Sequence, residues 1–377
     1  MVDSAWAEFW WSSVTGANMV VSNVVDALQE GNFAILSVPD DLPWRYQMRS
    51  TIELTFRKSW SSENVFVQTI DAADECGDQE PGRFLLEKYC KFRDIRMGYR
   101  ESSSKTIQQY LISNGVLHDS IIWVKGFLRG QAERWIKFCK EYKSSGIADG
   151  LCLLEIRDYT HTRDNKPITV VSFDDWVSNY DVQLLNSFIL DRGQRYSSYW
   201  KRYISTLAAC LCESDAEISA ELLDVMDFTK EEALSGLKKI VESNGYSSRG
   251  RDEKSGHVLA LFRHKRYEDL QKRVWAAQVQ VLFPLIELER ADYISKYSER
   301  IQLALNQEEI KQYGEVLNNP TEVELGTLYY LVKSRRINVP SADDRQRIES
   351  LRHYRNTIAH MGCLKPEEIK SLLSKHK

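Results

Sequence analysis

The sequence contains no apolar run close to the roughly 20 residues that a membrane-spanning helix needs. Its first eight residues include two acidic side chains and no basic one, which argues against a secretory signal peptide. The seven cysteines are scattered without a CxxC pair, so we expect neither a disulfide framework nor a zinc ribbon. Together these absences predict a cytoplasmic protein that has no membrane partner.

The composition is that of a folded globular protein. Hydrophobic residues make up 43% of the 377 residues and charged residues 28%, which excludes wholesale disorder. At roughly 100–200 residues per domain, the length indicates two or three domains, each with its own hydrophobic core.

In the first half of the chain, short apolar runs alternate with stretches of helical spacing. Fully apolar strands separated by helices are typical of a parallel sheet that is covered on both faces. We therefore expect residues 1–192 to form one α/β domain. The expected strands are Phe33–Val38, Val65–Ile70, Ser120–Val124, Leu151–Ile156 and Ile168–Phe173, and the expected helices are Trp44–Phe56, Arg83–Phe92 and Gln131–Tyr142.

A phosphate-binding loop is missing after the first expected strand. A nucleotide-binding protein would have GxxxxGK[ST] there, whose amides and lysine hold phosphate. Here Pro39 and Pro43 lack amide donors, and Asp40 and Asp41 would repel phosphate. The third strand ends in Lys125 instead of the acidic pair that holds Mg²⁺. The order of elements nonetheless resembles that of AAA/STAND NTPases. The resemblance implies a degenerate member that does not hydrolyse ATP and holds no cofactor.

Residues 193–265 are predicted to form a winged-helix-like module of three helices and a charged hairpin. Its third helix is expected to begin at Thr229, which has Glu232 three residues on as a capping box. The wing would end in an apolar strand over Val258–Phe262, and DNA phosphates would be contacted from its tip. The first two expected helices are Tyr199–Cys212 and Ala216–Met226, and the tip residues are Arg249, Arg251 and Lys254.

Residues 266–377 are predicted to be all-helical, with short links that favour a compact bundle. The expected helices are Leu270–Tyr297, Ile301–Leu317, Val323–Arg335, Ser341–Met361 and Pro366–Leu373.

The helix expected over Ser341–Met361 has two distinct faces. At about 100° per residue, one stripe is apolar and is predicted to face the bundle core. Arg352, Asn356 and His360 repeat every four residues on the opposite side, with Arg355 at the flank. The residues of the apolar stripe are Leu351, Tyr354, Ile358 and Met361.

Arg355, Asn356 and His360 match the R-N-x-x-x-H motif of the HEPN superfamily, which this region resembles over roughly residues 265–377. The resemblance implies a homodimer through the C-terminal bundle that cuts RNA without a metal. It also implies that Arg355 holds the scissile phosphate and that His360 transfers protons. Asn356 would orient either His360 or the phosphate. No metal site is expected, because the acidic cluster Asp71, Asp74 and Glu75 is typical of a solvated loop.

The predicted fold is therefore multidomain α+β: an NTPase-like parallel sheet, a winged-helix-like module and a HEPN-type bundle. The layout resembles prokaryotic antiviral or abortive-infection effectors, in which an NTPase-like part restrains a ribonuclease. Two other functions stay open. The chain could be a non-catalytic scaffold that uses the bundle to dimerise within a defence complex with protein partners, or a winged-helix DNA-binding component.

The formal net charge of −4 hides an asymmetry along the chain. Residues 333–377 carry 11 Lys and Arg against five acids, a net charge of +6, which leaves −10 for the remainder. This asymmetry favours a polyanion at the C-terminal bundle. Arg352, Arg335 and Arg336 are the predicted RNA-binding residues beside the motif.

Overall fold

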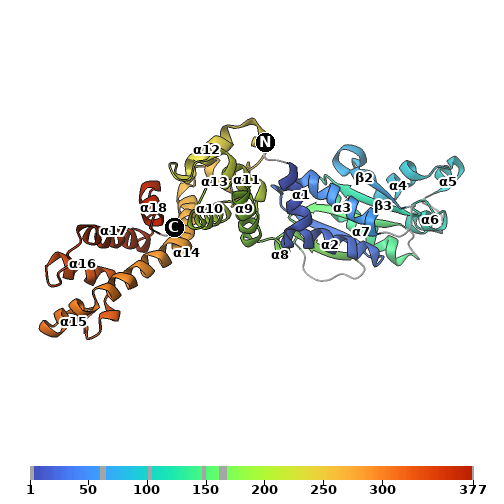
Figure 1. The fold of residues 1–377 in the computed structure, drawn as a ribbon. Coiled ribbons are helices and arrows are strands. Elements are labelled where there is room, and N and C mark those ends of the chain that lie inside the picture. The colour runs from blue at the N-terminus through green and yellow to red at the C-terminus, as the bar shows by residue number, and fades with distance from the viewer. Residues whose placement is uncertain (1–3, 60–64, 101–103, 147–149, 161–167, 376–377) are drawn as a thin grey trace. The chain divides into compact units, whose positions relative to one another are not determined.

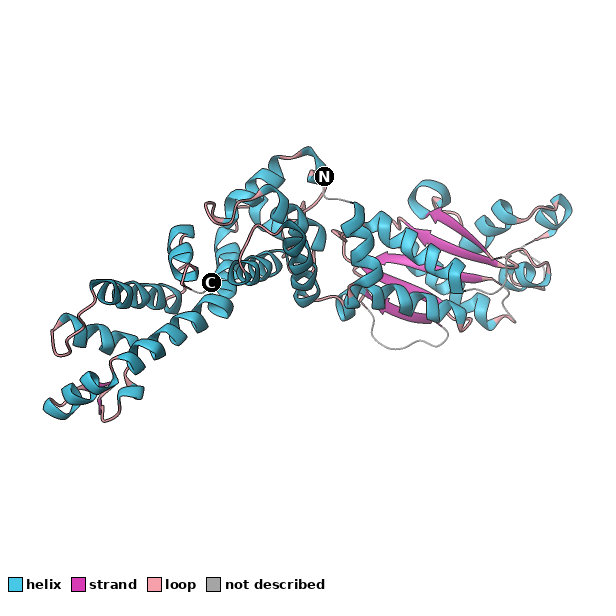
Figure 2. Ribbon diagram, viewed as in Figure 1, coloured by secondary structure: helices cyan, strands magenta, loops and turns pink. Residues whose placement is uncertain are grey.

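The computed structural model describes residues 4–59, 65–100, 104–146, 150–160 and 168–375. The chain divides into two compact units, residues 1–181 and 182–377. The N-terminal unit holds a five-stranded sheet, and the described part of the C-terminal unit is helical apart from one short hairpin (Figure 1, Figure 2). The expected mixture of an N-terminal α/β sheet with many helices is confirmed.

The five strands are all parallel and lie in the order β2-β3-β4-β1-β5. Each predicted strand is present to within one residue at either end. The three central strands β3, β4 and β1 are largely apolar and buried, as strands covered on both faces are, whereas the edge strand β2 is mostly exposed or half-buried. The strands are β1 (Phe33–Val38), β2 (Phe66–Asp71), β3 (Ser120–Lys125), β4 (Leu151–Arg157) and β5 (Ile168–Ser172).

Helices cover both faces of this sheet. From β1 the chain crosses to the edge strand β2 and then returns through β3 to β4, and right-handed crossovers in opposite directions leave their helices on opposite faces. Accordingly α2 packs on β1 and β5 together with α1 and α3, whereas α7 packs on β4 together with α4 and α6. The helices are α1 (Ser4–Ser13), α2 (Thr15–Gln29), α3 (Arg45–Ser59), α4 (Pro81–Tyr89), α5 (Arg93–Gly98), α6 (Ile107–Ser113), α7 (Gln131–Ser144) and α8 (Phe173–Trp176), with a π-helical turn η1 (Ala72–Cys76).

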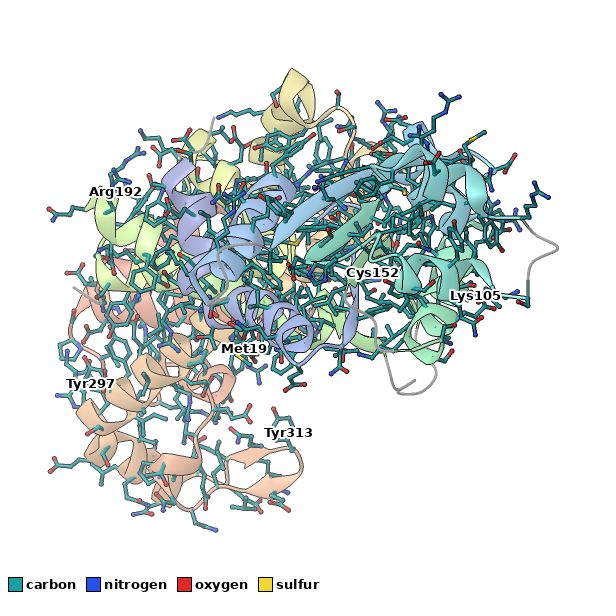
Figure 3. The ribbon with its side chains drawn as sticks, turned by 90° about the vertical axis from the view of Figure 1, so that its right-hand side faces the viewer. Met19, Lys105, Cys152, Arg192, Tyr297 and Tyr313 are labelled. Atoms are coloured by element: carbon teal, nitrogen blue, oxygen red, sulfur yellow. The ribbon has the colours of Figure 1, made fainter. Side chains whose placement is uncertain are left out.

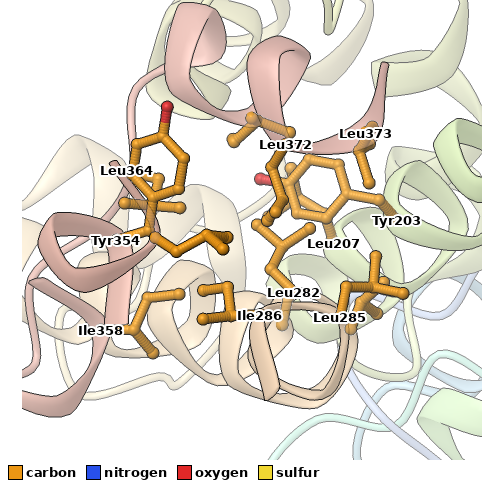
Figure 4. Packing of buried hydrophobic residues seen from close by; sticks show 14 of the residues in the cluster. Tyr203, Leu207, Leu282, Leu285, Ile286, Tyr354, Ile358, Leu364, Leu372 and Leu373 are labelled. Carbon is orange, nitrogen blue, oxygen red and sulfur yellow. The ribbon is translucent and has the colours of Figure 1, made fainter. Parts of the chain in front are cut away.

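The C-terminal unit has one hydrophobic core that extends from Leu190 to Leu373 (Figure 4). Residues 193–265 and 266–377, which the sequence separates into two modules, both contribute to it. The helices are α9 (Asn179–Gly193), within which the unit boundary falls, α10 (Ser198–Cys212), α11 (Ala216–Val225), α12 (Ala233–Glu242), α13 (Val258–Arg263), α14 (Tyr267–Lys296), α15 (Ser298–Gln307), α16 (Leu325–Lys333), α17 (Ala342–Ala359) and α18 (Pro366–Leu373), with 3₁₀ turns η2 (Asn244–Tyr246) and η3 (Pro320–Glu322).

The predicted wing strand over Val258–Phe262 is wrong, since these residues lie in helix α13. The His257 side chain caps the first turn by accepting a hydrogen bond from the Leu259 amide at 3.3 Å. A short apolar run suits a buried helix as well as a strand, and here the surrounding helices bury it. The predicted capping box is also wrong, because the Thr229 hydroxyl binds Asp227 at 2.7 Å and α12 begins only at Ala233.

The helix expected over Ile301–Leu317 is shorter than predicted. Helix α15 ends at Gln307, and a two-stranded antiparallel hairpin, β6 (Lys311–Gln312) and β7 (Glu315–Val316), follows it. A tight turn at Tyr313 and Gly314, both with positive φ, prevents the helix from continuing.

A buried ion pair orients α17 against the long helix α14. Arg347 lies on the same face as Leu351, Tyr354 and Ile358, and all four are buried. Its guanidinium donates to the Glu289 carboxylate, with Nε at 2.8 Å, and Nη1 donates to the Ser371 carbonyl at 3.0 Å. One arginine therefore joins α17 to α14 and α18.

We predict that Arg347→Ala lowers the free energy of unfolding by about 3–5 kcal/mol, because it leaves the Glu289 carboxylate buried without a guanidinium partner. Urea denaturation measures the change. Gln346→Ala, at the exposed neighbouring position, is the control and is expected to change it by less than about 0.5 kcal/mol. Equal stability of the two variants would contradict the assignment.

Candidate functional site

The motif residues lie on the side of α17 that is turned away from the buried stripe. Arg352, Arg355 and Asn356 are half-buried and His360 is exposed. Among the described residues, neither the Asn356 side chain nor the His360 imidazole has a hydrogen-bond partner. The helix thus presents the predicted Arg, Asn and His together on an open surface.

The two arginines of this surface contact α16, which runs beside α17. Arg355 Nη2 lies 3.6 Å from Glu324 Oε2, a long ion pair between half-exposed groups. The Arg352 guanidinium lies over the Tyr329 ring, 4.6 Å from its centroid. Lys333 Nζ donates to the Tyr329 hydroxyl at 2.9 Å. Cationic and aromatic groups therefore alternate along one face, as in surfaces that bind nucleic acid.

Two side chains of α14, the half-buried Trp275 and the buried Gln278, hold the end of α17. Trp275 Nε1 of α14 donates to the Ile358 carbonyl at 2.6 Å. The buried Gln278 accepts from the Leu364 amide at 2.7 Å and donates to the Leu364 carbonyl at 3.0 Å. Helix α17 ends at Ala359, and the backbone at Met361 is left-handed, with φ 61°. The Met361 side chain is therefore exposed to solvent, and the prediction that it belongs to the apolar core stripe is wrong.

The other two predicted RNA-binding residues lie where α16 ends. Arg335 is exposed and has positive φ. Arg336 pairs with Glu308 at 2.7 Å and lies over the Tyr330 ring at 4.9 Å. Arg336 therefore ties the end of α15 to α16.

The predicted DNA-contacting tip does not present its first arginine to a ligand. Arg249 is 14% exposed and binds the buried Asp215 at 3.0 Å and Glu217 at 2.7 Å. His257 Nε2 also lies 2.8 Å from Asp215. Burial alone would raise the pKa of Asp215, but the charge of Arg249 and the contact with His257 outweigh it and lower that pKa. Arg251 and Lys254 are exposed, without the predicted strand to carry them, so the DNA-binding prediction is not supported by a wing.

In the N-terminal unit, a cleft of about 650 Å³ opens at the carboxyl ends of the strands. The sheet reverses its order between β4 and β1, and such a switch point is where α/β proteins bind ligands. The loop of residues 39–44 follows β1 here, at the position of a phosphate-binding loop.

Arg45, the first residue of α3, binds two carbonyl groups of this loop and the Glu155 carboxylate. Its Nη2 donates to the carbonyls of Pro39 at 2.8 Å and Asp40 at 2.9 Å, and its Nη1 donates to Glu155 at 2.8 Å. Arg49 donates to both oxygens of the same carboxylate, at 2.7 and 2.8 Å. The loop therefore points carbonyl oxygens, which repel phosphate, at an internal guanidinium.

Two of the three acidic residues of the predicted cluster are paired with lysines, and the third, Asp74, is exposed. Asp71 binds Lys125 at 3.0 Å, and Glu75 binds Lys88. In both cases the lysine contact contributes to lowering the carboxyl pKa: for Asp71 it overcomes the opposing effect of burial, and for Glu75 the bond to Lys88 is the largest cause. Among the described residues, no group of three or more His, Cys, Asp or Glu side chains could hold a metal ion. All seven cysteines lie in the described ranges, and none of them forms a disulfide.

Comparison with protein-family models and with curated proteins finds no match to this chain. No helix in the described part of the chain is both long and apolar enough to cross a membrane.

Three residues that organise these sites were not singled out from the sequence. Arg347 could have been found, because it lies four residues before Leu351 and so on the apolar stripe. Glu155 also carried a signal, as an acid within an otherwise apolar strand that needs a cationic partner. No feature of the sequence indicated Tyr313, since its turn lies within a segment that was expected to be helical.

We predict that Arg249 is structural and that Arg251 is dispensable for stability. Arg249→Ala is expected to lower the free energy of unfolding by about 3 kcal/mol, because the buried Asp215 loses its strongest cationic partner. Arg251→Ala is expected to change it by less than about 0.5 kcal/mol. Urea denaturation of both variants tests this, and similar losses would show that Arg249 does not stabilise the fold through Asp215.

A second prediction concerns the pH dependence of stability. Burial would raise the pKa of Glu155, but the Arg49 hydrogen bond and the charges of Arg49 and Arg45 lower it below the ordinary 4.5. A carboxyl with a lowered folded-state pKa stabilises the fold above about pH 4.5 and loses that contribution as the pH falls. We expect the unfolding free energy of wild type to fall more between pH 7 and pH 3 than that of Glu155→Gln. Glu133→Gln, in the same cleft but exposed, should follow wild type, and parallel curves for all three would refute the assignment.

Proposed function

We propose that this chain is a metal-independent endoribonuclease of the HEPN type that acts through Arg355, Asn356 and His360. The observation that carries the proposal is the placement of these side chains. Arg355 lies at the flank of the apolar stripe, Asn356 lies on the opposite side of α17 and the exposed His360 directly follows the helix, and no described side chain engages Asn356 or His360. Residues that merely closed a helical bundle would be buried against it, as Arg347 of the same helix is.

The chemistry follows from the side-chain types. A permanently charged guanidinium binds a phosphodiester through two parallel hydrogen bonds. Imidazole can accept and donate a proton near neutral pH. As His360 takes the proton from the ribose 2′-hydroxyl, the 2′-oxygen bonds to phosphorus and the bond to the 5′-oxygen breaks. The leaving 5′-oxygen takes a proton from water and the protonated His360 returns its proton to water, so the products are a 2′,3′-cyclic phosphate and a 5′-hydroxyl.

The surroundings of the motif support binding of a polyanion. Arg352 and Lys333 lie on the same face, and the segment from residue 333 onward carries a net charge of +6. The Arg355–Glu324 pair is long and half-exposed, so a phosphate can replace Glu324 at low cost. In the proposed assembly two copies pair through the C-terminal bundle, and the small, exposed Ala359 allows close approach.

For the N-terminal unit we propose a degenerate NTPase-like domain of the AAA/STAND type that restrains the ribonuclease. A parallel sheet with helices on both faces and a switch point between β4 and β1 supports this. The contacts of Arg45 with Pro39 and Asp40 support the loss of ATP hydrolysis. The same resemblance favours a role in antiviral defence.

We predict that purified protein cleaves RNA in the presence of EDTA and that His360→Ala and Arg355→Ala each slow cleavage by about 100-fold or more. Both positions are on the surface, so each variant should unfold within about 0.5 kcal/mol of wild type. Gln346→Ala, exposed at the other end of α17, is the control and should keep the wild-type rate. Cleavage by either motif variant at the wild-type rate would refute the proposed function.

A further inference from the structure

Tyr313 occupies a backbone position that disfavours an aromatic residue. It is the first of the two residues that connect β6 to β7, and its φ is 52°, followed by 89° at Gly314. Two successive positive φ angles define the type I′ hairpin turn, in which Asn, Asp or Gly is preferred at the first position. A bulky side chain in this region lowers the stability of the turn, so the turn itself does not account for the tyrosine.

The Tyr313 ring is also unusually open to solvent, with 81% of the residue exposed. Figure 3 labels it at the turn of the hairpin. The hairpin itself is held by Gln312, whose Oε1 accepts from the Glu324 amide at 3.0 Å and from the Thr327 hydroxyl at 2.7 Å. Gln312 Nε2 donates to the Glu322 carbonyl at 3.0 Å. Gln312 therefore fixes the hairpin to the start of α16 through three bonds that do not involve the Tyr313 ring.

The position of this ring is set relative to the motif. The Tyr313 hydroxyl donates to Glu324 Oε2 at 2.7 Å, and the same oxygen lies 3.6 Å from Arg355 Nη2. One carboxylate oxygen thus contacts both the Tyr313 hydroxyl and the arginine that is proposed to hold phosphate. A nucleotide bound at Arg355 would bring a neighbouring base within reach of the ring.

We propose that Tyr313 is a base-stacking residue that positions unpaired RNA so that one defined phosphodiester lies at Arg355. This inference rests on the proposed function, because it describes how the RNA strand is held at the proposed ribonuclease site. An aromatic face accepts every base, so stacking gives affinity with little sequence preference beyond the stronger stacking of purines. A base within a duplex has no free face to offer, and the site would therefore select unpaired strands.

Binding of a non-cleavable probe tests the inference separately from catalysis. The probes are fluorescein-labelled 12-nucleotide strands of 2′-O-methyl adenosine or 2′-O-methyl uridine, which lack the 2′-hydroxyl that cleavage needs. Fluorescence anisotropy compares wild type, Tyr313→Phe and Tyr313→Asn in the full-length protein. Phe keeps the ring and loses the bond to Glu324, whereas Asn suits the turn and loses the ring.

We expect Tyr313→Asn to bind the adenosine strand about tenfold more weakly than wild type and to lose the preference for adenosine over uridine. Tyr313→Phe is expected to stay within about twofold of wild type on both strands. Urea denaturation should show Tyr313→Asn to be no less stable than wild type, because Asn favours the positive φ.

Wild-type affinity of Tyr313→Asn would overturn the inference, and so would equal losses in the Asn and Phe variants or no binding of the strands by wild type. Cleavage that depends on His360 together with binding that is independent of Tyr313 would remove the stacking role alone. Binding that depends on the Tyr313 ring without any cleavage would support the stacking role and contradict only the ribonuclease.

Discussion

The buried ion pair between Arg347 and Glu289 determines which side of α17 faces solvent. It lies on the helix face that also carries Leu351, Tyr354 and Ile358, so packing and electrostatics impose the same rotation. A half-turn of the helix would place a guanidinium in water and bury Arg352 and Asn356 without partners, which is strongly unfavourable. The exposure of the motif is thus a consequence of the core, and the chemistry proposed for the C-terminal unit depends on it.

A comparable constraint operates in the N-terminal unit, with the opposite consequence for ligands. Glu155 is 3% exposed and is neutralised by Arg45 and Arg49, whose guanidinium groups lie at the carboxyl end of the sheet. In a phosphate-binding loop that place belongs to amide donors and a nucleotide. Here two guanidinium groups share the Glu155 carboxylate, and Arg45 also donates to the carbonyls of Pro39 and Asp40. The sheet thus has a switch point with a cleft beside it, and the side chains at that point form an internal salt bridge.

Much of the fold could be predicted from the sequence, and the exceptions have identifiable physical causes. Most strands of the sheet are short apolar runs bounded by polar residues, and such a run predicts a buried strand. The run Val258–Phe262 has the same apolar pattern but is a helix. The surrounding helices and the His257 cap favour a helix over a strand here. In the motif helix, the positions of Arg352, Asn356 and His360 follow from helical spacing alone. The proximity of Glu324 and Tyr313 to Arg355 could not be predicted, because it depends on how α16 and the hairpin pack against α17.

The most direct measurement of the central claim is the chemistry at the cut phosphodiester. An RNA that the protein cleaves in EDTA is compared with the same RNA carrying a single 2′-deoxynucleotide on the 5′ side of the cut, and the product ends are identified by mass spectrometry. The proposed mechanism predicts 2′,3′-cyclic phosphate and 5′-hydroxyl ends, with no cleavage at the substituted position. Cleavage next to the 2′-deoxynucleotide, or products with 5′-phosphate ends, would contradict it.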